Sequence, residues 1–373
     1  MMTPARMTPA ARALAFNALV RNRSSIAQKA AAKALLAAKA LHPQGASPSL
    51  AEPADRLRFL ERLAGHVHSI DTLRNQGGFK FLVKPDSSKY PVSQLKATPK
   101  SRGLGRAAVA IDCEMVQTKV PELAKASSEV ARLCAVDVLT NEVLIDAWVR
   151  PQGKVVDYHS SISGVTERRL KNAEASGTLL KGFKEAREAL YQHIDDNTIL
   201  VGHGLENDLY PLRMLHTRLV DTALISKLAM DAGLAKVWGL KHLSNVFLGR
   251  VVQRKKKAHC PVEDVQAVVD ILRLIVGNPT LLEIWAREID NAQREINALR
   301  AAHEAEIGTE AAEREQKEMA EALELYSGED FQAEPPQGDD LLPTTETSQT
   351  STPTTPAINT QGRPENFISL GGF

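Results

Sequence analysis

The sequence predicts an α/β fold in which helices flank a mixed β-sheet. From about residue 107 to 277, apolar runs of strand length alternate with segments of helical periodicity. The turn LTNEV is short enough to join its flanking strands as an antiparallel hairpin, so the sheet is not purely parallel. The chain has 373 residues and is 43% hydrophobic, which is sufficient for a substantial core.

Strands and helices are predicted along this region in chain order. The strand candidates are AAVAIDC from residue 107, EVARLCAVDVL from 129, EVLIDAWVR from 142 and TILVGH from 198. The helix candidates are residues 179–191, 205–216, 222–230, 239–247 and 261–276. Pro261 suits the first turn of the last helix, whose apolar residues recur on one face.

Two segments precede this region. Residues 1–51 are Ala-rich and carry seven Arg or Lys before the first acid, Glu52. This composition is typical of a mitochondrial targeting segment, but it also suits a basic arm that touches RNA phosphates. Residues 52–106 combine one helical pattern with a Gly, Pro and Ser-rich linker, and their role is unknown.

Two further segments follow it. Residues 280–334 are predicted to form a helical extension that is acidic from Glu304 onward. Its apolar residues recur at steps of three and four, and we expect this short heptad seam to pack on the domain. Those residues are Leu282, Trp285, Ile289, Ala292, Ile296 and Leu299. Residues 335–373 are rich in Pro, Thr, Ser and Gln and are predicted to be disordered.

The overall composition excludes some classes of protein. Lys and Arg total 46 against 45 Asp and Glu, so the net charge of +1 indicates no particular partner. Cys113, Cys134 and Cys260 form no CxxC pair, which favours a reducing intracellular compartment over a disulfide scaffold. No apolar run reaches the roughly 18 residues of a membrane span, and we expect neither a membrane partner nor a secretory signal.

The stretch VAIDCEMV places two acids in a predicted buried strand. Asp112 and Glu114 are two residues apart and project from the same face, with Cys113 on the other. Burying both charges is costly unless one pKa rises, an Arg pairs with them, or they bind a divalent cation. The cation is the best solution if further acids converge on the pair.

Two other segments supply such acids. In ILVGHGLENDLYPLRML, a strand and a Gly-flanked turn lead into a helix whose first turn contains Asp208. This position lies near the carboxyl end of the strand, where open α/β sheets bind ligands. Asp264 lies near the start of the helix that begins at Pro261, and His259 lies on the loop just before it.

These motifs resemble a known enzyme family. IDCEMV, GHGLENDLYPLR with VDTA, WGLKHLSNVFLG and HCPVED are similar, in this order and spacing, to motifs of the DEDD superfamily of 3′ to 5′ exonucleases. DCEMV and DYHSSISGVT are most similar to its eukaryotic Rex-type RNA exonuclease branch. The resemblance covers residues 107–277, neither flank included, and implies a ribonuclease H-like fold for an exonuclease domain at 107–279.

The resemblance also assigns the catalytic residues. Asp112, Glu114, Asp208 and Asp264 are the implied metal ligands, and His259 is the general base of the histidine-type (DEDDh) subgroup. The tyrosine-type subgroup would need Tyr where this chain has Cys260. Val265 replaces the more usual Ala after the last Asp, which affects only the packing behind the site.

The implied reaction is hydrolysis of phosphodiester bonds by a two-metal mechanism. Two Mg²⁺ or Mn²⁺ ions about 3.5 to 4 Å apart would neutralise charge at the phosphate. By resemblance, Asp112 bridges the ions, Glu114 and Asp264 complete one site, and Asp208 supports the other. The expected partner is single-stranded nucleic acid, mainly RNA. Single-stranded DNA or oligonucleotides, or a role as a nucleic-acid-binding scaffold, are the alternatives.

Substrate contacts are expected beside these residues. Met115 and Val116 would lie against the terminal nucleotide, or would be ordinary core. His159, with Tyr158, and Asn207 are further nucleotide-binding candidates, whereas His203 is expected to play a structural role. The basic run after Arg250 would attract the nucleic-acid backbone, or would be a solvated loop or part of a nuclear localisation signal. It contains Arg254, Lys255, Lys256 and Lys257.

Two compartments are consistent with the sequence. The family resemblance implies the nucleus or nucleolus, and the basic, acid-free N-terminus favours the mitochondrion.

Overall fold

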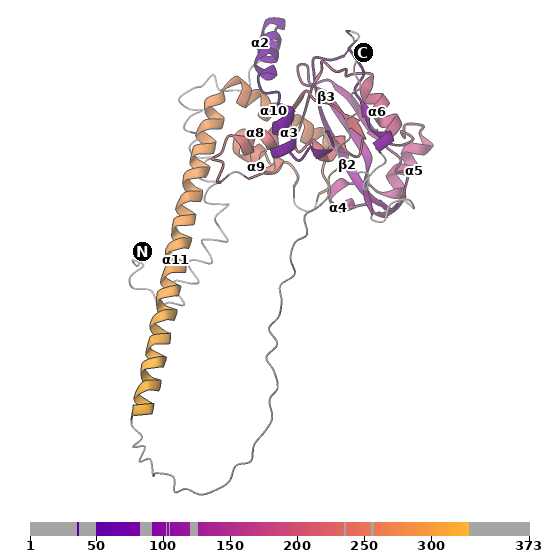
Figure 1. Cartoon of the computed structure of the whole chain (residues 1–373). Coiled ribbons are helices and arrows are strands. Elements are labelled where there is room, and N and C mark those ends of the chain that lie inside the picture. The colour runs from indigo at the N-terminus through magenta and orange to yellow at the C-terminus, as the bar shows by residue number, and fades with distance from the viewer. Residues whose placement is uncertain are drawn as a thin grey trace, which may run out of the picture. The chain divides into compact units, whose positions relative to one another are not determined.

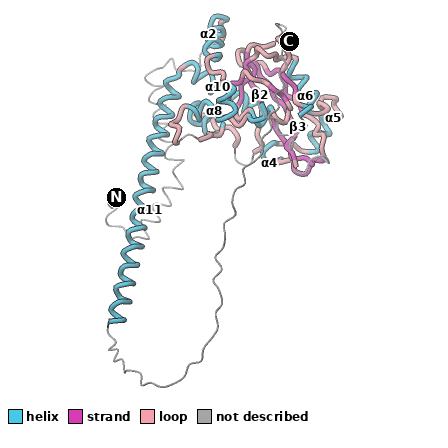
Figure 2. The backbone as a smooth tube through the Cα atoms, in the orientation of Figure 1, coloured by secondary structure: helices cyan, strands magenta, loops and turns pink. Residues whose placement is uncertain are grey.

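The computed structural model describes residues 36, 50–82, 92–101, 103, 105–119, 126–234, 236–254 and 257–327 (Figures 1 and 2). The predicted tail at 335–373 and nearly all of the predicted arm at 1–51 lie outside these ranges. The chain divides into two units, Met1–Glu310 and Ala311–Phe373, and the first contains the fold described below.

A six-stranded mixed sheet forms the centre of the first unit, as predicted. Strand β2 (Ala108–Lys119) pairs antiparallel with β3 (Ser127–Asp137) and parallel with β6 (Ile199–Gly202). The strand order is β4-β3-β2-β6-β8, and β5 pairs with the far end of β2. The other bounds are β4 (Val143–Trp148), β5 (Lys154–Asp157) and β8 (Leu219–Asp221).

Helices cover both faces of this sheet (Figure 1). The strand residues Ala110 and Val136 pack with α10 (Pro261–Gly277), whereas Ile111 and Leu133 pack with α6 (Phe183–Tyr191) on the other face. The remaining helices are α4 (Ser160–Ser163), α5 (Glu167–Ala175), α7 (Glu206–Leu209), α8 (Thr222–Leu228) and α9 (Leu240–Leu243). Strand alternation therefore places Asp112 and Glu114 on the face covered by α10.

The predicted helix at 205–216 is wrong in length. Helix α7 ends at Leu209, two residues before Pro211, which cannot donate a helical hydrogen bond. Arg213 then adopts a left-handed conformation (φ 54°), and β7 (Met214–Leu215) pairs in parallel with β1 (Lys96–Ala97). Helix α9 is also short, and a π-helical segment at Ser244–Leu248 continues it.

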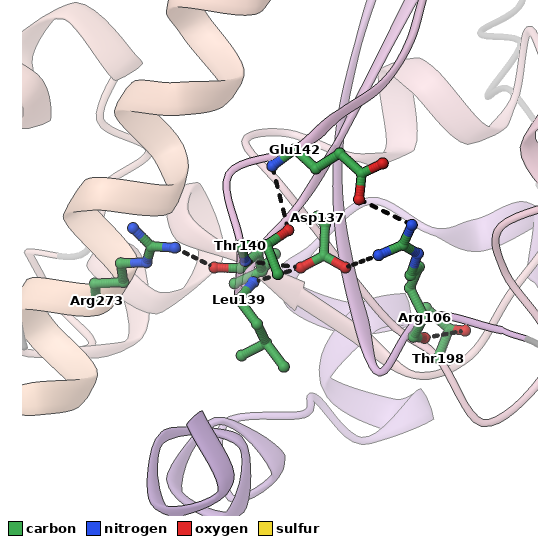
Figure 3. Close-up of polar contacts among 8 residues, drawn as sticks. Arg106, Asp137, Leu139, Thr140, Glu142, Thr198 and Arg273 are labelled. Atoms are coloured by element: carbon green, nitrogen blue, oxygen red, sulfur yellow. Dashed lines mark hydrogen bonds and ion pairs between the residues drawn. The ribbon is translucent and has the colours of Figure 1, made fainter. Parts of the chain in front are cut away.

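The predicted hairpin is confirmed, and Asp137 holds its turn (Figure 3). The Asp137 carboxylate accepts the backbone N–H groups of Leu139 and Thr140 at 2.8 and 2.9 Å. Arg106 donates to the same carboxylate and also pairs with Glu142 across the turn. These bonds satisfy backbone N–H groups of the turn that have no partner in the strand ladder.

Part of the 52–106 segment belongs to the folded domain, which therefore extends beyond the predicted start at 107. Phe59 and Leu63 of α2 (Pro53–Ala64) join the core on the α10 face. Leu73 of α3 (Ile70–Gln76) and Phe79, just before a 3₁₀ turn at Lys80–Leu82, join the core on the α6 face. A second 3₁₀ turn, Val92–Gln94, precedes β1.

His68, between α2 and α3, covers the edge of the sheet. Its backbone N–H donates to the carbonyl of Leu219 at 3.0 Å, and its Nε2 accepts the N–H of Asp221 at 3.1 Å. Strand β8 is the last in the sheet order, so these bonds satisfy groups that would otherwise be unpaired at an edge.

The first turns of α11 (Pro279–Ser327) pack on the domain, which confirms the expectation for Leu282, Trp285, Ile289 and Ala292. The side chain of Leu299 lies outside the described part of the chain. Trp285 and Ile289 are buried in the core on the α10 face. The Trp285 ring contacts the rings of Trp238 and Phe247 at centroid distances of 5.6 and 5.7 Å. Among the helices described, none is both long and apolar enough to cross a bilayer.

Two leucines of α2 test whether this helix is part of the domain. Leu63 is fully buried, whereas the Leu57 side chain is 59% exposed. Leu63→Ala should lower the free energy of unfolding by about 2–5 kcal/mol, because it leaves a cavity in the shared core. The matched variant Leu57→Ala should change it by less than about 0.5 kcal/mol. Equal, small losses in urea denaturation would show that α2 does not contribute to the folded domain.

Candidate active site

Strand β2 supplies the first two carboxylates. Glu114 is buried and faces Arg132 of β3 in the strand register, and Asp112 faces Cys134. The register shifts between Glu114 and Met115, so the strand bends directly after the acidic pair. The Arg132 guanidinium donates to both carboxylate oxygens of Asp146 at 2.8 and 3.0 Å. The nearby Arg is therefore already paired, and its charge lowers the pKa of Asp112 and Glu114 by less than burial and the neighbouring acids raise it.

A tight turn after β6 delivers Asp208. Gly202 ends the strand, and a Cβ there would lie 2.3 Å from the Leu205 side chain, so only Gly fits. The buried Asp221 accepts the backbone N–H groups of Gly204 and Leu205 at 3.0 and 2.7 Å, which fixes the turn. Asp208 then points at β2, where its Oδ1 accepts the N–H of Cys113 at 2.8 Å.

Helix α10 and the loop before it supply Asp264 and His259. Asp264 is buried in the first turn of the helix, and its Oδ2 lies 3.8 Å from His259 Nδ1. The loop is held against α4, because the His259 N–H donates to the carbonyl of Ile162 at 2.7 Å. Gly164 has φ 67°, and a Cβ there would lie 3.0 Å from Ala258, so Gly allows this close approach.

The four acids act on one another electrostatically. Burial, followed by the charge of Asp264, raises the pKa of Asp112 to about 8. Burial, Asp112 and Asp264 raise the pKa of Glu114 to about 9. Burial and then Asp112 raise the pKa of Asp208, and burial raises that of Asp264. The structure thus brings together the acids that are far apart in the sequence.

The carboxylate oxygens of the four acids suit a hard divalent cation, because of their chemistry and because they are buried. Glu114 Oε1 and Asp264 Oδ1 are buried and lack a hydrogen-bond partner, which is costly for an acid oxygen without a ligand. Carboxylate oxygens are the ligands that Mg²⁺ and Mn²⁺ prefer. In the part of the chain that is described, no three His, Cys, Asp or Glu side chains form a ready-made metal cluster. Coordination by several of these acids would therefore require their side chains to reorient.

The predicted nucleotide contacts have different surroundings. Val116 is fully buried in a small cluster with Ala131, Val165 and Leu170, so its side chain is core and has no surface for a nucleotide. Met115 is only partly buried, at the rim of the α6-face core. Asn207 is exposed, and its amide caps its own turn by donating to the carbonyl of Gly204 at 3.1 Å.

Three other residues singled out in the sequence have the following contacts. His159 has a left-handed backbone (φ 47°), and its Nδ1 lies 3.0 Å from Asp157 Oδ2. Tyr158 is partly buried against the Val116 cluster. His203 Nδ1 lies 3.0 Å from the Thr222 hydroxyl, a contact of the kind expected for a structural role.

The basic run is only partly described. Arg250 is ion-paired with Asp270 of α10, whereas Arg254 and Lys257 are exposed. Lys255 and Lys256 lie outside the described residues.

Two residues that support the site were not predicted as functional. Asp221, from the VDTA motif, fixes the turn before Asp208, and Gln253 donates to Asp264. The VDTA motif could have indicated the role of Asp221, but no local sequence pattern indicates that of Gln253.

The region that contains this site is similar to known exonucleases. Residues 109–272 match a family model described as the RNase_T exonuclease family. These residues form an RNase_T exonuclease domain. RNA exonuclease 3 of Candida albicans is 33% identical over 211 residues, which are 57% of this chain and 46% of that protein. Small RNA degrading nuclease 2 of Arabidopsis thaliana is 34% identical over 174 residues, 46% of this chain and 35% of that protein.

The chain is also similar to part of a solved structure. The Neurospora crassa Pan2 catalytic unit, which comprises a protease and a nuclease domain, is 20% identical, with a TM-score of 0.41. That match covers 51% of this chain and 32% of the Pan2 chain. The chain spans less than half the length of the two curated relatives described above.

The raised pKa values predict how the metal-free exonuclease domain responds to pH. From about pH 4 to the raised values of about 8 and 9, folded Asp112 and Glu114 hold protons that the unfolded chain releases. The free energy of unfolding therefore falls as pH rises through this window. Asp112→Asn removes one of these titrations, so in EDTA its melting temperature should exceed that of wild type by about 3 °C or more at pH 8 and by little at pH 5.

Asp71 provides the control for this measurement, because it is an exposed carboxylate on α3. The melting-temperature difference between Asp71→Asn and wild type should not grow with pH. Adding Mg²⁺ at pH 8 should stabilise wild type more than Asp112→Asn. A constant difference for Asp112→Asn between pH 5 and 8 would contradict the raised pKa of Asp112.

Proposed function

We propose that this domain is a 3′ to 5′ exonuclease that hydrolyses single-stranded RNA with two divalent ions, Mg²⁺ or Mn²⁺, per site. The observation that carries the proposal is the grouping of four mutually repelling carboxylates, from β2, α7 and α10, beside His259. A purely structural domain has no use for so many buried acids.

The residues divide into ligands and a base. Asp112, Glu114, Asp208 and Asp264 would hold the ions, which when bound neutralise charge on the scissile phosphate. His259 is partly exposed beside Asp264, and its imidazole takes the proton from the attacking water. Asp264 Oδ2 lies on the Nδ1 side of that ring and stabilises the charge that His259 gains.

The basic loop and the curated relatives support RNA as the proposed substrate class. The exposed Arg254 and Lys257 precede His259 in the chain and would attract phosphates without reading sequence. Both curated relatives described above are named for activity on RNA. Met115, His159 and Asn207 remain the proposed contacts to the terminal nucleotides, with Val116 contributing only to the core behind them.

A digestion assay tests this function directly. A 5′-labelled single-stranded RNA and its DNA counterpart are incubated with wild type and Mg²⁺, Mn²⁺ or EDTA. We expect a metal-dependent ladder that shortens from the 3′ end, stronger on RNA. Preference for the DNA strand would change the substrate class, and no ladder on either strand from folded protein would favour a binding scaffold.

Asp112→Ala should abolish the ladder. The substitution removes a ligand for the ions and should reduce the rate by at least about 100-fold. Asp71→Ala, which removes an exposed carboxylate on α3, should retain the wild-type rate. Near-normal turnover by Asp112→Ala would refute the metal assignment.

His259→Ala should slow hydrolysis by about 10²–10⁴-fold, because it removes the general base. His193 lies outside the site, and His193→Ala should keep the wild-type rate. A near-normal rate in His259→Ala would assign the base to another group.

A further inference from the structure

Gln253 has a backbone conformation that is unusual for its residue type. Its φ is 49°, in the left-handed region that Gly, Asn and Asp adopt far more readily than Gln. Such a conformation costs of order 1–3 kcal/mol and persists only where surrounding contacts determine it. The conformation therefore calls for an account of what holds Gln253 and what its side chain does.

The Gln253 side chain points at a proposed metal ligand. Its Nε2 donates to Asp264 Oδ2 at 3.0 Å. His259 Nδ1 approaches the same oxygen, at 3.8 Å. The other oxygen, Oδ1, is buried and has no hydrogen-bond partner. One oxygen of Asp264 is thus occupied by Gln253, and the other is left free within the acidic group.

Neighbouring contacts fix the loop that carries Gln253. Lys241 of α9 donates from Nζ to the Gln253 carbonyl at 2.7 Å. Three residues earlier, the Arg250 carbonyl accepts the Ser244 hydroxyl at 2.9 Å, and the Arg250 guanidinium pairs with Asp270 of α10. The loop is therefore attached to α9, the π-helical segment and α10, and these bonds offset the cost of the left-handed backbone.

We propose that Gln253 is a positioning residue that holds Asp264 by its Oδ2 and so presents Oδ1 to a divalent cation. The inference rests on the proposed function. In this arrangement the side-chain amide sets the orientation of the carboxylate before the cation binds, which reduces the ordering that binding requires. The basic residues on the same loop then attract the phosphate backbone of the nucleic acid, while Gln253 orients the metal ligand Asp264.

Two substitutions of Gln253 distinguish the effect of its side-chain amide from the effect of its backbone conformation. Gln253→Gly removes the side chain and adopts φ 49° without strain, whereas Gln253→Leu keeps most of the side-chain size but loses the donor. Val251→Ala changes an exposed side chain two residues away and serves as the control. Circular dichroism in EDTA establishes that each variant is folded.

The primary measurement is the rise in melting temperature of the RNA-free protein as MnCl₂ is added. Loss of the bond should raise the MnCl₂ concentration for half-maximal stabilisation by about tenfold in both Gln253 variants and not in Val251→Ala. In RNA digestion, kcat should fall at limiting MnCl₂ and recover at excess MnCl₂, while KM for RNA stays unchanged.

The possible results are distinct. If MnCl₂ stabilises wild type and both Gln253 variants equally, the positioning role is wrong. If Gln253→Gly behaves as wild type and only Gln253→Leu is impaired, the loop conformation matters and the amide does not, which also overturns the inference. If wild type itself neither responds to MnCl₂ nor degrades RNA, the proposed function fails and the inference fails with it.

Discussion

Mutual repulsion among buried carboxylates is the constraint around which this domain is organised. Asp112 and Glu114 lie on one strand face, and Asp208 and Asp264 reach the same place from two helices. Each acid raises the cost of ionising its neighbours, so the site opposes the stability of the fold when no cation is bound. The surrounding structure has to hold these groups together against that repulsion.

The scaffold does so with bonds to the backbone at the points where the acids enter. Asp221 fixes the turn before Asp208, and the N–H of Cys113 binds Asp208 itself. The His68 segment in turn covers strand β8, which ends at Asp221. The N-terminal helices therefore support the site through the sheet edge, although they contribute no catalytic group.

The loop between the π-helical segment and α10 combines two tasks. Its exposed cations face solvent, where a phosphate backbone can approach, and its Gln253 faces inward to Asp264. His259 at the end of the loop is held to α4 by a backbone hydrogen bond, which ties the DYHSSISGVT segment to His259. One short stretch of chain thus carries both the exposed cations and the contact that orients the Asp264 carboxylate.

The sequence by itself determined the features that depend on local periodicity. Strand alternation placed Asp112 and Glu114 on one face, and Pro261 with its apolar pattern defined α10 and hence the place of Asp264. Tertiary structure decided what depends on residues distant in the chain. It buried Val116, drew α2 and α3 into the core and aimed Gln253 at Asp264. None of these carries a periodic signal, because each is fixed by which partner is nearest once the sheet has formed.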